Sequence, residues 1–180
     1  MRGRHLAWPL AAALTSASAC APRDHANLER EFELGSHRVR VLAPAGWELA
    51  DQGTQKRFRN GESQIVLVDL EPATRPLTDS DRERLGDLDQ FAEWGLAALG
   101  GAGGDQRREV RSKRTITIDS HQAVDIETWN RLDHTWPQRL LFLRVDGDLF
   151  ALHTPGRADA DTMAAFEAIL DSLHFISPPA

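Results

Sequence analysis

The amino-acid sequence predicts an α+β domain in which helices pack on an antiparallel β-sheet. Three observations support this prediction. Short segments of alternating apolar and polar residues are joined by tight-turn signals, which is typical of antiparallel hairpins. Two longer segments carry apolar residues at helical spacing. The segments follow the order strands, helix, strands, helix, which favours an α+β sandwich over alternating βαβ units.

Two hairpins are expected in the first part of the domain. Their strands and turns are Glu31–Leu34 and His37–Leu42 around Gly35 and Ser36, then Thr54–Arg59 and Ser63–Leu70 around Asn60 and Gly61. Asparagine followed by glycine is a strong hairpin-turn signal. Every residue from Ile65 to Val68 is apolar, so this strand is expected at the centre of the sheet, covered on both faces.

The rest of the domain is predicted as a helix, four strands and a second helix. The first helix begins at Thr78 or Ser80, where capping residues lie, and ends at Leu99 before Gly100. Its apolar face consists of Leu85, Leu88, Phe91, Ala92, Gly95, Leu96 and Leu99. The strands are expected over Val110–Asp119, Gln122–Arg131, Arg139–Asp146 and Leu149–Thr154. The final helix spans Asp159–Leu173, with Met163, Phe166, Ile169, Leu170 and Leu173 on its buried side.

The N-terminus has the three parts of a secretory signal. Arg2 and Arg4 precede an apolar run from Leu6 to Leu14, and small residues then lead to Cys20. This run has nine residues, far fewer than the ~20 that a membrane-spanning helix needs. We therefore expect residues 1–19 to be a removable signal segment.

Two cleavage sites fit the residues before Cys20. Ala17-Ser18-Ala19 fits an ordinary small-residue site, which would leave Cys20 simply as the first mature residue. Together with Cys20 the same residues resemble the Leu-Ala-Gly-Cys pattern of bacterial lipoproteins, although Ala17 stands where leucine is commoner. Cys20 is the only cysteine, and an exported protein with one cysteine cannot form an internal disulfide. This favours lipid attachment at Cys20.

The expected organisation is thus a signal peptide over residues 1–19, a tether over 20–29 and a single domain over 30–176. Attached acyl chains would hold the protein at a membrane. Ala21 resembles the residue that sorts enterobacterial lipoproteins to the outer membrane, facing the periplasm. Without Arg2 and Arg4, 19 Lys and Arg stand against 27 Asp and Glu, a net charge of −8. Such an acidic body is unsuited to binding nucleic acid or anionic lipid head groups.

The domain pattern resembles the Mog1/PsbP-like fold, which includes DcrB-type bacterial lipoproteins and the PsbP proteins of photosystem II. The resemblance covers residues 30–176 and rests on an early strand ending in Pro44-x-Gly46-Trp47 and on the terminal pattern from Phe166 to Phe175. It implies an α/β/α sandwich, no shared catalytic residues and a role as an accessory or docking protein.

No catalytic, metal or cofactor site is predicted. The seven histidines show none of the clustered spacings of zinc ligands, and no nucleophile elbow or phosphate-binding loop is present. Trp129, His134 and Trp136 flank an expected turn and form a candidate partner contact, since tryptophan is enriched at binding hot spots. Packing of Trp129 under a helix and of Trp136 at the turn is the simpler interpretation.

Three functional hypotheses follow. The first is a non-enzymatic envelope lipoprotein that binds a protein partner or supports assembly. The second is a carrier of a small ligand or lipid, with a pocket between sheet and helix; filling of that interface by Leu88, Phe91 and Leu96 would argue against it. The third is an unrecognised hydrolase, which requires His, Ser and Asp side chains within hydrogen-bond reach of one another.

Overall fold

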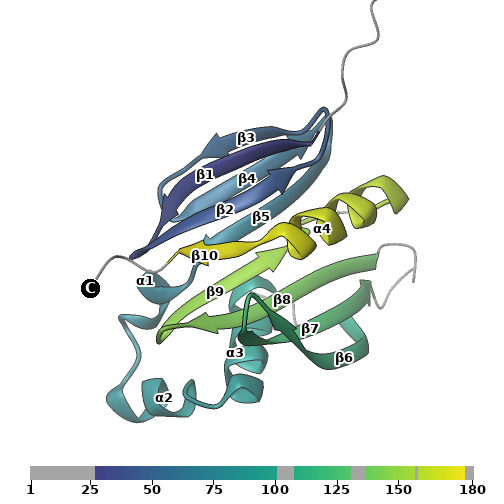
Figure 1. Ribbon diagram of the computed structural model, residues 1–180. Helices are drawn as coiled ribbons and strands as arrows, with labels where there is room; N and C mark the ends of the chain where they lie inside the picture. The colour runs from purple at the N-terminus through teal and green to yellow at the C-terminus, as the bar shows by residue number, and fades with distance from the viewer. Residues whose placement is uncertain (1–26, 101–107, 131–136, 157, 177–180) are drawn as a thin grey trace, which may run out of the picture.

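The computed structural model describes residues 27–100, 108–130, 137–156 and 158–176 (Figure 1). Their strands are β1 (Leu28–Leu34), β2 (His37–Ala43), β3 (Glu48–Asp51), β4 (Gln55–Asn60), β5 (Ser63–Asp69), β6 (Arg108–Ile118), β7 (His121–Asn130), β8 (Pro137–Val145), β9 (Asp148–His153) and β10 (His174–Ile176). Their helices are α1 (Glu71–Thr74), α2 (Asp79–Arg84), α3 (Leu88–Gly100) and α4 (Ala160–Ser172). The predicted signal segment lies outside the described residues, as does the tether before Asn27.

The described strands form two antiparallel sheets. The larger sheet has the order β3-β4-β5-β9-β8-β7-β6, and the smaller has the order β1-β2-β10. Helix α3 packs on β7 and β8, whereas α4 contacts β2 and β5. In Figure 1, α4 and the smaller sheet therefore lie on one side of the larger sheet and α3 lies on the other. The predicted α+β class and its layered packing are confirmed, but one expected sheet is in fact two.

The first hairpin leaves the main sheet at a tight turn between β2 and β3. The N–H of Trp47 donates to the carbonyl oxygen of Pro44 at 3.0 Å, and Gly46 has a φ of +80°. Proline cannot donate to a strand ladder, and a positive φ favours glycine. Trp47 is only 8% exposed and packs in the core between the layers. The Pro-x-Gly-Trp segment thus separates the two sheets.

Two hydrophobic cores fill the space on the two faces of the larger sheet. The first core lies under α4 and the smaller sheet and contains Val39, Phe58, Leu141, Phe150, Phe166 and Ile169 among others. The second core lies under α3 and contains Phe91, Val124, Leu140, Phe142 and Ala151 among others. Strand β5 supplies Ile65 and Leu67 to the first core and Val66 and Val68 to the second. Its predicted position, covered on both faces, is confirmed.

The predicted continuous helix from Thr78 or Ser80 to Leu99 is wrong, because the chain breaks it into α2 and α3. A Cβ at Gly86 would lie 2.7 Å from the carbonyl oxygen of Glu83, so only glycine fits this closing turn. The Asp87 carboxylate then accepts a hydrogen bond from the backbone N–H of Gln90 at 2.9 Å, which caps the start of α3. The break turns α2 away from the line of α3 and opens a space between them.

The second hairpin turn lies one residue later than predicted. Asn60 pairs with Ser63 across the hairpin, so Gly61 and Glu62 form the loop. Gly61 has a φ of +60°, a conformation that glycine adopts without steric cost. The turn at Gly35 and Ser36 between β1 and β2 lies where it was predicted. The turns that precede His121 and Asp148 each lie one residue earlier than predicted.

Candidate interaction site

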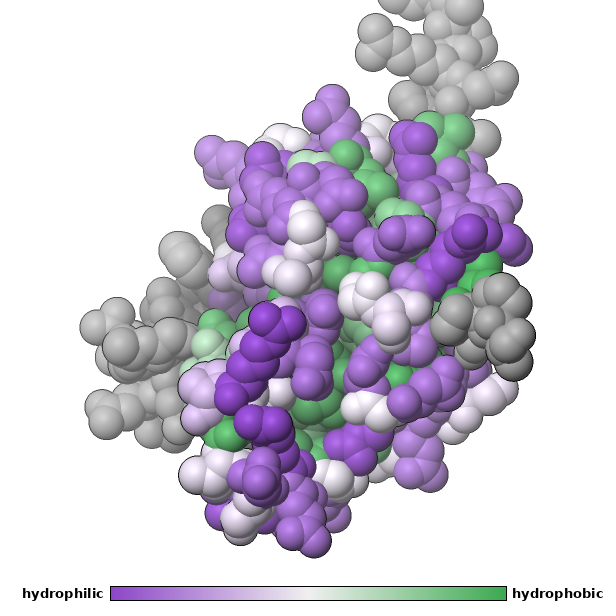
Figure 2. Space-filling model, turned by 90° about the vertical axis from the view of Figure 1, so that its left-hand side faces the viewer, coloured by the Kyte–Doolittle hydropathy of each residue, from purple (hydrophilic) through white to green (hydrophobic). Residues whose placement is uncertain are grey.

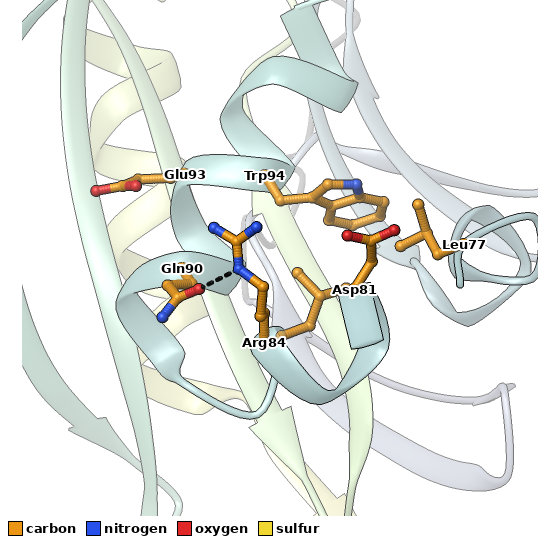
Figure 3. Close-up of a pocket in the computed structure, with 7 residues that line it drawn as sticks. Leu77, Asp81, Arg84, Gln90, Glu93 and Trp94 are labelled. Carbon is orange, nitrogen blue, oxygen red and sulfur yellow. Dashed lines mark hydrogen bonds between the residues drawn. The ribbon is translucent and has the colours of Figure 1, made fainter. Parts of the chain in front are cut away.

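A cavity of about 400 Å³ opens between α2 and α3 (Figure 3). We call it the Trp94 pocket, and its lining residues are Leu77, Asp81, Arg84, Leu85, Gln90, Glu93 and Trp94. Leu77, Leu85 and Trp94 make its floor apolar, and the other four residues form a polar rim. This combination of an apolar floor and a few polar groups is typical of binding sites.

The walls of the Trp94 pocket are held by hydrogen bonds within the α2 region. Thr78 caps α2 by accepting from the backbone N–H of Asp81 at 3.2 Å. Arg82 donates to the carbonyl oxygens of Leu77 and Arg75, both at 3.1 Å, and so holds the segment that leads into the helix. Arg84 Nε donates to Gln90 Oε1 at 3.0 Å across the helix break, as Figure 3 shows. The pocket is therefore formed before any partner arrives.

Trp94 rests on the second core through Phe91. The two rings stack with centroids 6.3 Å apart and an angle of 27° between their planes. Phe91 is fully buried and meets the Phe142 ring edge-on at 5.6 Å. Trp94 itself is partly buried, so its indole ring is supported from below and reachable from the pocket.

The surface around the Trp94 pocket is acidic. Between residues 79 and 93 six carboxylates stand against two arginines, a net charge of −4; the acidic residues are Asp79, Asp81, Glu83, Asp87, Asp89 and Glu93. Lys113 of β6 offsets part of this charge, because its Nζ lies 3.0 Å from Asp89 and 3.8 Å from Glu93. The site is thus suited to an apolar side chain with positive charges beside it.

The interface between α3 and the larger sheet is filled. Phe91 is completely buried there, and Leu88 and Leu96 pack on the same core. Gly95 lies so close to Phe142 that a Cβ would be 2.3 Å from ring atom Cε1. In this described interface, side chains occupy the place where the carrier hypothesis puts a ligand.

Ser36, His37 and Asp148 do come together, as the hydrolase hypothesis requires. Ser36 Oγ donates to Asp148 Oδ2 at 2.5 Å, and His37 Nε2 lies 3.2 Å from the same oxygen. In a catalytic triad the histidine accepts the proton of the serine, and the carboxylate only orients the histidine. Here the carboxylate accepts from serine directly, and neither ring nitrogen of His37 has a hydrogen-bond partner. The cluster lacks the proton path of a hydrolase.

His37 is instead a packed residue at the junction of the two sheets. Its side chain is 2% exposed, and its ring meets Phe150 and Phe175 edge-on, with centroids 5.5 and 6.0 Å away. Asp69 lies nearby, and burial raises the pKa of its carboxyl, although a hydrogen bond from the N–H of Glu71 opposes this effect.

Asp125 and Arg139 form a buried ion pair between strands β7 and β8. Two nitrogens of Arg139 donate to the two Asp125 oxygens at 2.9 Å, and Arg114 and Glu167 extend the network. Asp125 is 3% and Arg139 5% exposed. The Arg139 guanidinium also lies over the buried Phe166 ring of α4, 4.9 Å from its centroid. The pair closes one end of the first core.

Trp129 is the one predicted contact residue that the structure describes; Cys20, His134 and Trp136 lie outside the described residues. Trp129 is partly buried on β7 and is not among the residues of either core. Its Nε1 donates to Glu127 at 3.3 Å, and the Arg111 guanidinium carbon lies 5.2 Å from its ring. A role in partner binding remains a prediction.

Trp94 does not stand out in the sequence. Its position three residues after Phe91 makes it part of a helix face, where an aromatic residue usually belongs to the core. The signal that distinguishes it is the run of acidic residues that precedes it, from Asp79 to Glu93. The described residues contain no helix long and apolar enough to cross a bilayer. They also contain no group of three His, Cys, Asp or Glu side chains arranged to hold a metal ion.

Comparison with known proteins identifies the fold. No known protein family and no curated protein matches the sequence. The solution structure of cyanobacterial PsbP (CyanoP) from Synechocystis sp. PCC 6803 matches with a TM-score of 0.54 and 14% identity, over 89% of this chain and 99% of that one. The chain therefore has the Mog1/PsbP-like fold that the sequence predicts.

Two further structures are less similar. One is PA94 from Pseudomonas aeruginosa, a protein of unknown function and putative regulator, with a TM-score of 0.41, 16% identity and coverage of 84% of this chain and 99% of that one. The other is LpqN of Mycobacterium tuberculosis, involved in cell envelope biogenesis, with a TM-score of 0.41, 14% identity and coverage of 84% and 91%. The fold assignment rests on CyanoP alone.

Proposed function

We propose that this protein is a non-enzymatic binding protein of the bacterial envelope, anchored through lipid on Cys20. The preformed Trp94 pocket is the observation that carries the binding role. The arrangement of Ser36, His37 and Asp148 supports a role without hydrolysis, since it lacks a histidine positioned to accept the serine proton.

The tether length supports work close to a membrane. Strand β1 begins at Leu28, eight residues after Cys20. Fully extended, these residues span about 27 Å. The acidic body would not adhere to anionic lipid, so the covalent anchor keeps it at the surface. Figure 2 shows a face covered mainly by hydrophilic residues, with hydrophobic side chains visible only in small separate areas. Such a face suits a domain that is held near a membrane and surrounded by water.

Metabolic labelling with a radioactive fatty acid tests the anchor. We expect label on the parent protein in the outer-membrane fraction, and neither label nor membrane association in Cys20→Ala. The Ala21→Ser variant, which keeps the cysteine, serves as the matched control and should remain labelled. An unlabelled parent, or label retained by Cys20→Ala, would overturn the lipoprotein assignment.

Crosslinking in intact cells tests the binding role. A photoreactive amino acid at Gln90, on the rim of the Trp94 pocket, should give one discrete crosslinked species. The same group at Asp171, an exposed position on α4, is the control. Absence of a discrete product from Gln90, together with absence from Trp129, would contradict a protein-binding role.

A further inference from the structure

We propose that the Trp94 pocket binds a basic segment of a partner protein, which places one apolar side chain on Trp94 and lysine or arginine beside the acidic rim. This inference rests on the proposed binding function and specifies its site and partner chemistry.

The floor of the pocket supplies the contact for the apolar side chain. Leu77, Leu85 and Trp94 line it, and Trp94 is supported by the buried Phe91 ring. A cavity of about 400 Å³ lies within the range of ~300–1,000 Å³ usual for ligand sites. Tryptophan on a rigid support loses little freedom when it is covered, which is one reason why it is frequent at binding hot spots.

The charges on the rim select a basic partner. Asp81 and Glu93 line the pocket, and the side chain of Glu93 is 75% exposed. The basic rim residue Arg84 already uses its Nε to bind Gln90. Residues 79–93 carry a net charge of −4, and Lys113 at Asp89 and Glu93 together with Arg144 at the carbonyl oxygens of Leu85 and Gly86 bring the local charge to −2, which still favours cations. The same charge repels anionic head groups, so a membrane surface is a poor candidate for this site.

The position of the pocket fits a tethered protein. In Figure 1 strand β1 begins near the top of the molecule, whereas α2 lies at the bottom. The Trp94 pocket is therefore at the end of the domain away from the start of β1. A partner can reach it while the chain is anchored.

A titration with short peptides tests the proposal. The full lipidated chain, in micelles of a non-ionic detergent, is titrated with Lys-Lys-Leu-Lys-Lys, Lys-Lys-Gly-Lys-Lys or Glu-Glu-Leu-Glu-Glu, and the NMR signal of the Trp94 indole N–H is followed. These peptides are too short to enter micelles as amphipathic helices. We expect the leucine-lysine peptide to shift this signal and to bind at least fivefold more tightly than the other two.

Variants separate the pocket from general charge attraction. Asp81→Asn combined with Glu93→Gln should weaken binding at least fivefold. Glu48→Gln combined with Asp171→Asn removes the same charge from exposed positions outside the pocket and should leave binding unchanged. Trp94→Ala should abolish binding, and Trp94→Phe, which keeps an aromatic floor, should retain part of it. Because these two variants lack the Trp94 indole signal, their binding and that of the parent are compared by isothermal titration calorimetry. Circular dichroism confirms that each variant is folded.

Equal binding of the leucine and glycine peptides, or equal weakening by the control pair, would overturn the proposal. A shift of the Trp94 signal by micelles containing phosphatidylglycerol, without peptide, would assign the pocket to lipid instead. If no peptide binds while Cys20 is labelled and Trp129 gives a discrete crosslink in cells, only the assignment of this pocket fails. If the label on Cys20 and the crosslink at Trp129 are both absent as well, the proposed function itself fails.

Discussion

Gly95 of α3 and Phe142 of β8 touch at the centre of the interface between helix and sheet. A Cβ at position 95 would lie 2.3 Å from Cε1 and 2.7 Å from Cδ1 of the Phe142 ring. Phe142 is fully buried and held edge-on by Phe91, so its ring cannot move aside. The absence of a side chain at Gly95 therefore sets how closely α3 approaches the sheet, and through Phe91 it sets the position of Trp94.

The Gly95→Ala variant is expected to lower the free energy of unfolding by about 1–3 kcal/mol, because the added methyl group overpacks a filled core. In an exposed helix the same change would stabilise by about 1 kcal/mol. Urea denaturation of the variant provides the measurement. In a Phe142→Leu background the loss should shrink, since the ring no longer opposes the new methyl group. A gain in stability from Gly95→Ala alone would contradict the contact.

Asp125→Ala is expected to lower the free energy of unfolding by about 3–5 kcal/mol, because it leaves the buried Arg139 without its main counter-charge. Arg114→Ala is the matched control. The Arg114 side chain is 61% exposed, so its loss should cost at most about 1 kcal/mol. Replacing the pair together, by Asp125→Leu and Arg139→Met, should cost less than Asp125→Ala. If Asp125→Ala, Arg114→Ala and the double variant all lower the free energy of unfolding by a similar small amount, the pair is not buried in solution.

Asp125 should contribute to the loss of stability of the protein at pH values below the ordinary pKa of an aspartate. Burial by itself raises the pKa of this carboxyl, but hydrogen bonds from Arg139 and Arg114 outweigh burial and lower the pKa below the ordinary value of 3.8. The ionised form is thus favoured in the fold. Its contribution to stability is present above pH 3.8 and is lost as the pH falls through the lowered value. Unfolding followed between pH 2 and 5 should show this loss in the parent and not in Asp125→Asn.

His153 should destabilise the fold in mildly acidic solution. Burial lowers the pKa of His153 to about 4, and the positive charges of Arg108 and Arg57 act in the same direction. The neutral ring is therefore favoured in the fold, and its contribution is present above about pH 6.5 and lost as the pH falls towards 4. NMR titration of the ring should give a pKa near 4, and Arg57→Gln should raise it. Titration near 6.5 in the parent would refute this environment.

Asp69→Asn is expected to raise the melting temperature at pH 7. Burial raises the pKa of the Asp69 carboxyl, so its charged form is disfavoured in the fold. In the parent the backbone N–H of Glu71 donates to the Asp69 carboxyl at 2.9 Å. An asparagine side chain is uncharged but keeps an oxygen that can accept this hydrogen bond. At pH 3, where the carboxyl is largely protonated in both states, the gain should be smaller. Asp171→Asn, at an exposed position, is the control that should change little.

Much of the fold was predictable from residues close together in the chain. Alternating residues in β2, the unbroken apolar run in β5 and the helical spacing in α4 each mark one element, and the described structure contains all three. The break at Gly86 and Asp87 was missed because the apolar spacing continues across it, and spacing alone does not detect a cap. Strand β3 and helix α1 were missed because each has only four residues.

The candidate site was less predictable. The sequence pointed to Trp129 and Trp136 at a turn as candidate contacts, and not to Trp94. A helical tryptophan beside Phe91 has the pattern of a core residue. Only the angle between α2 and α3, which depends on one glycine and one cap, leaves Trp94 at the wall of a cavity.

By itself the sequence determined most of the longer elements, the fold class and the acidic charge, because each depends on turn chemistry, periodicity or composition within short stretches. It also carries the prediction of a lipid on Cys20. The tertiary structure decided which strands form the smaller sheet, that Asp125 and Arg139 are buried together, and that Gly95 meets Phe142. Those features arise from residues far apart in the chain, and side-chain packing, which local patterns do not contain, brings them into contact.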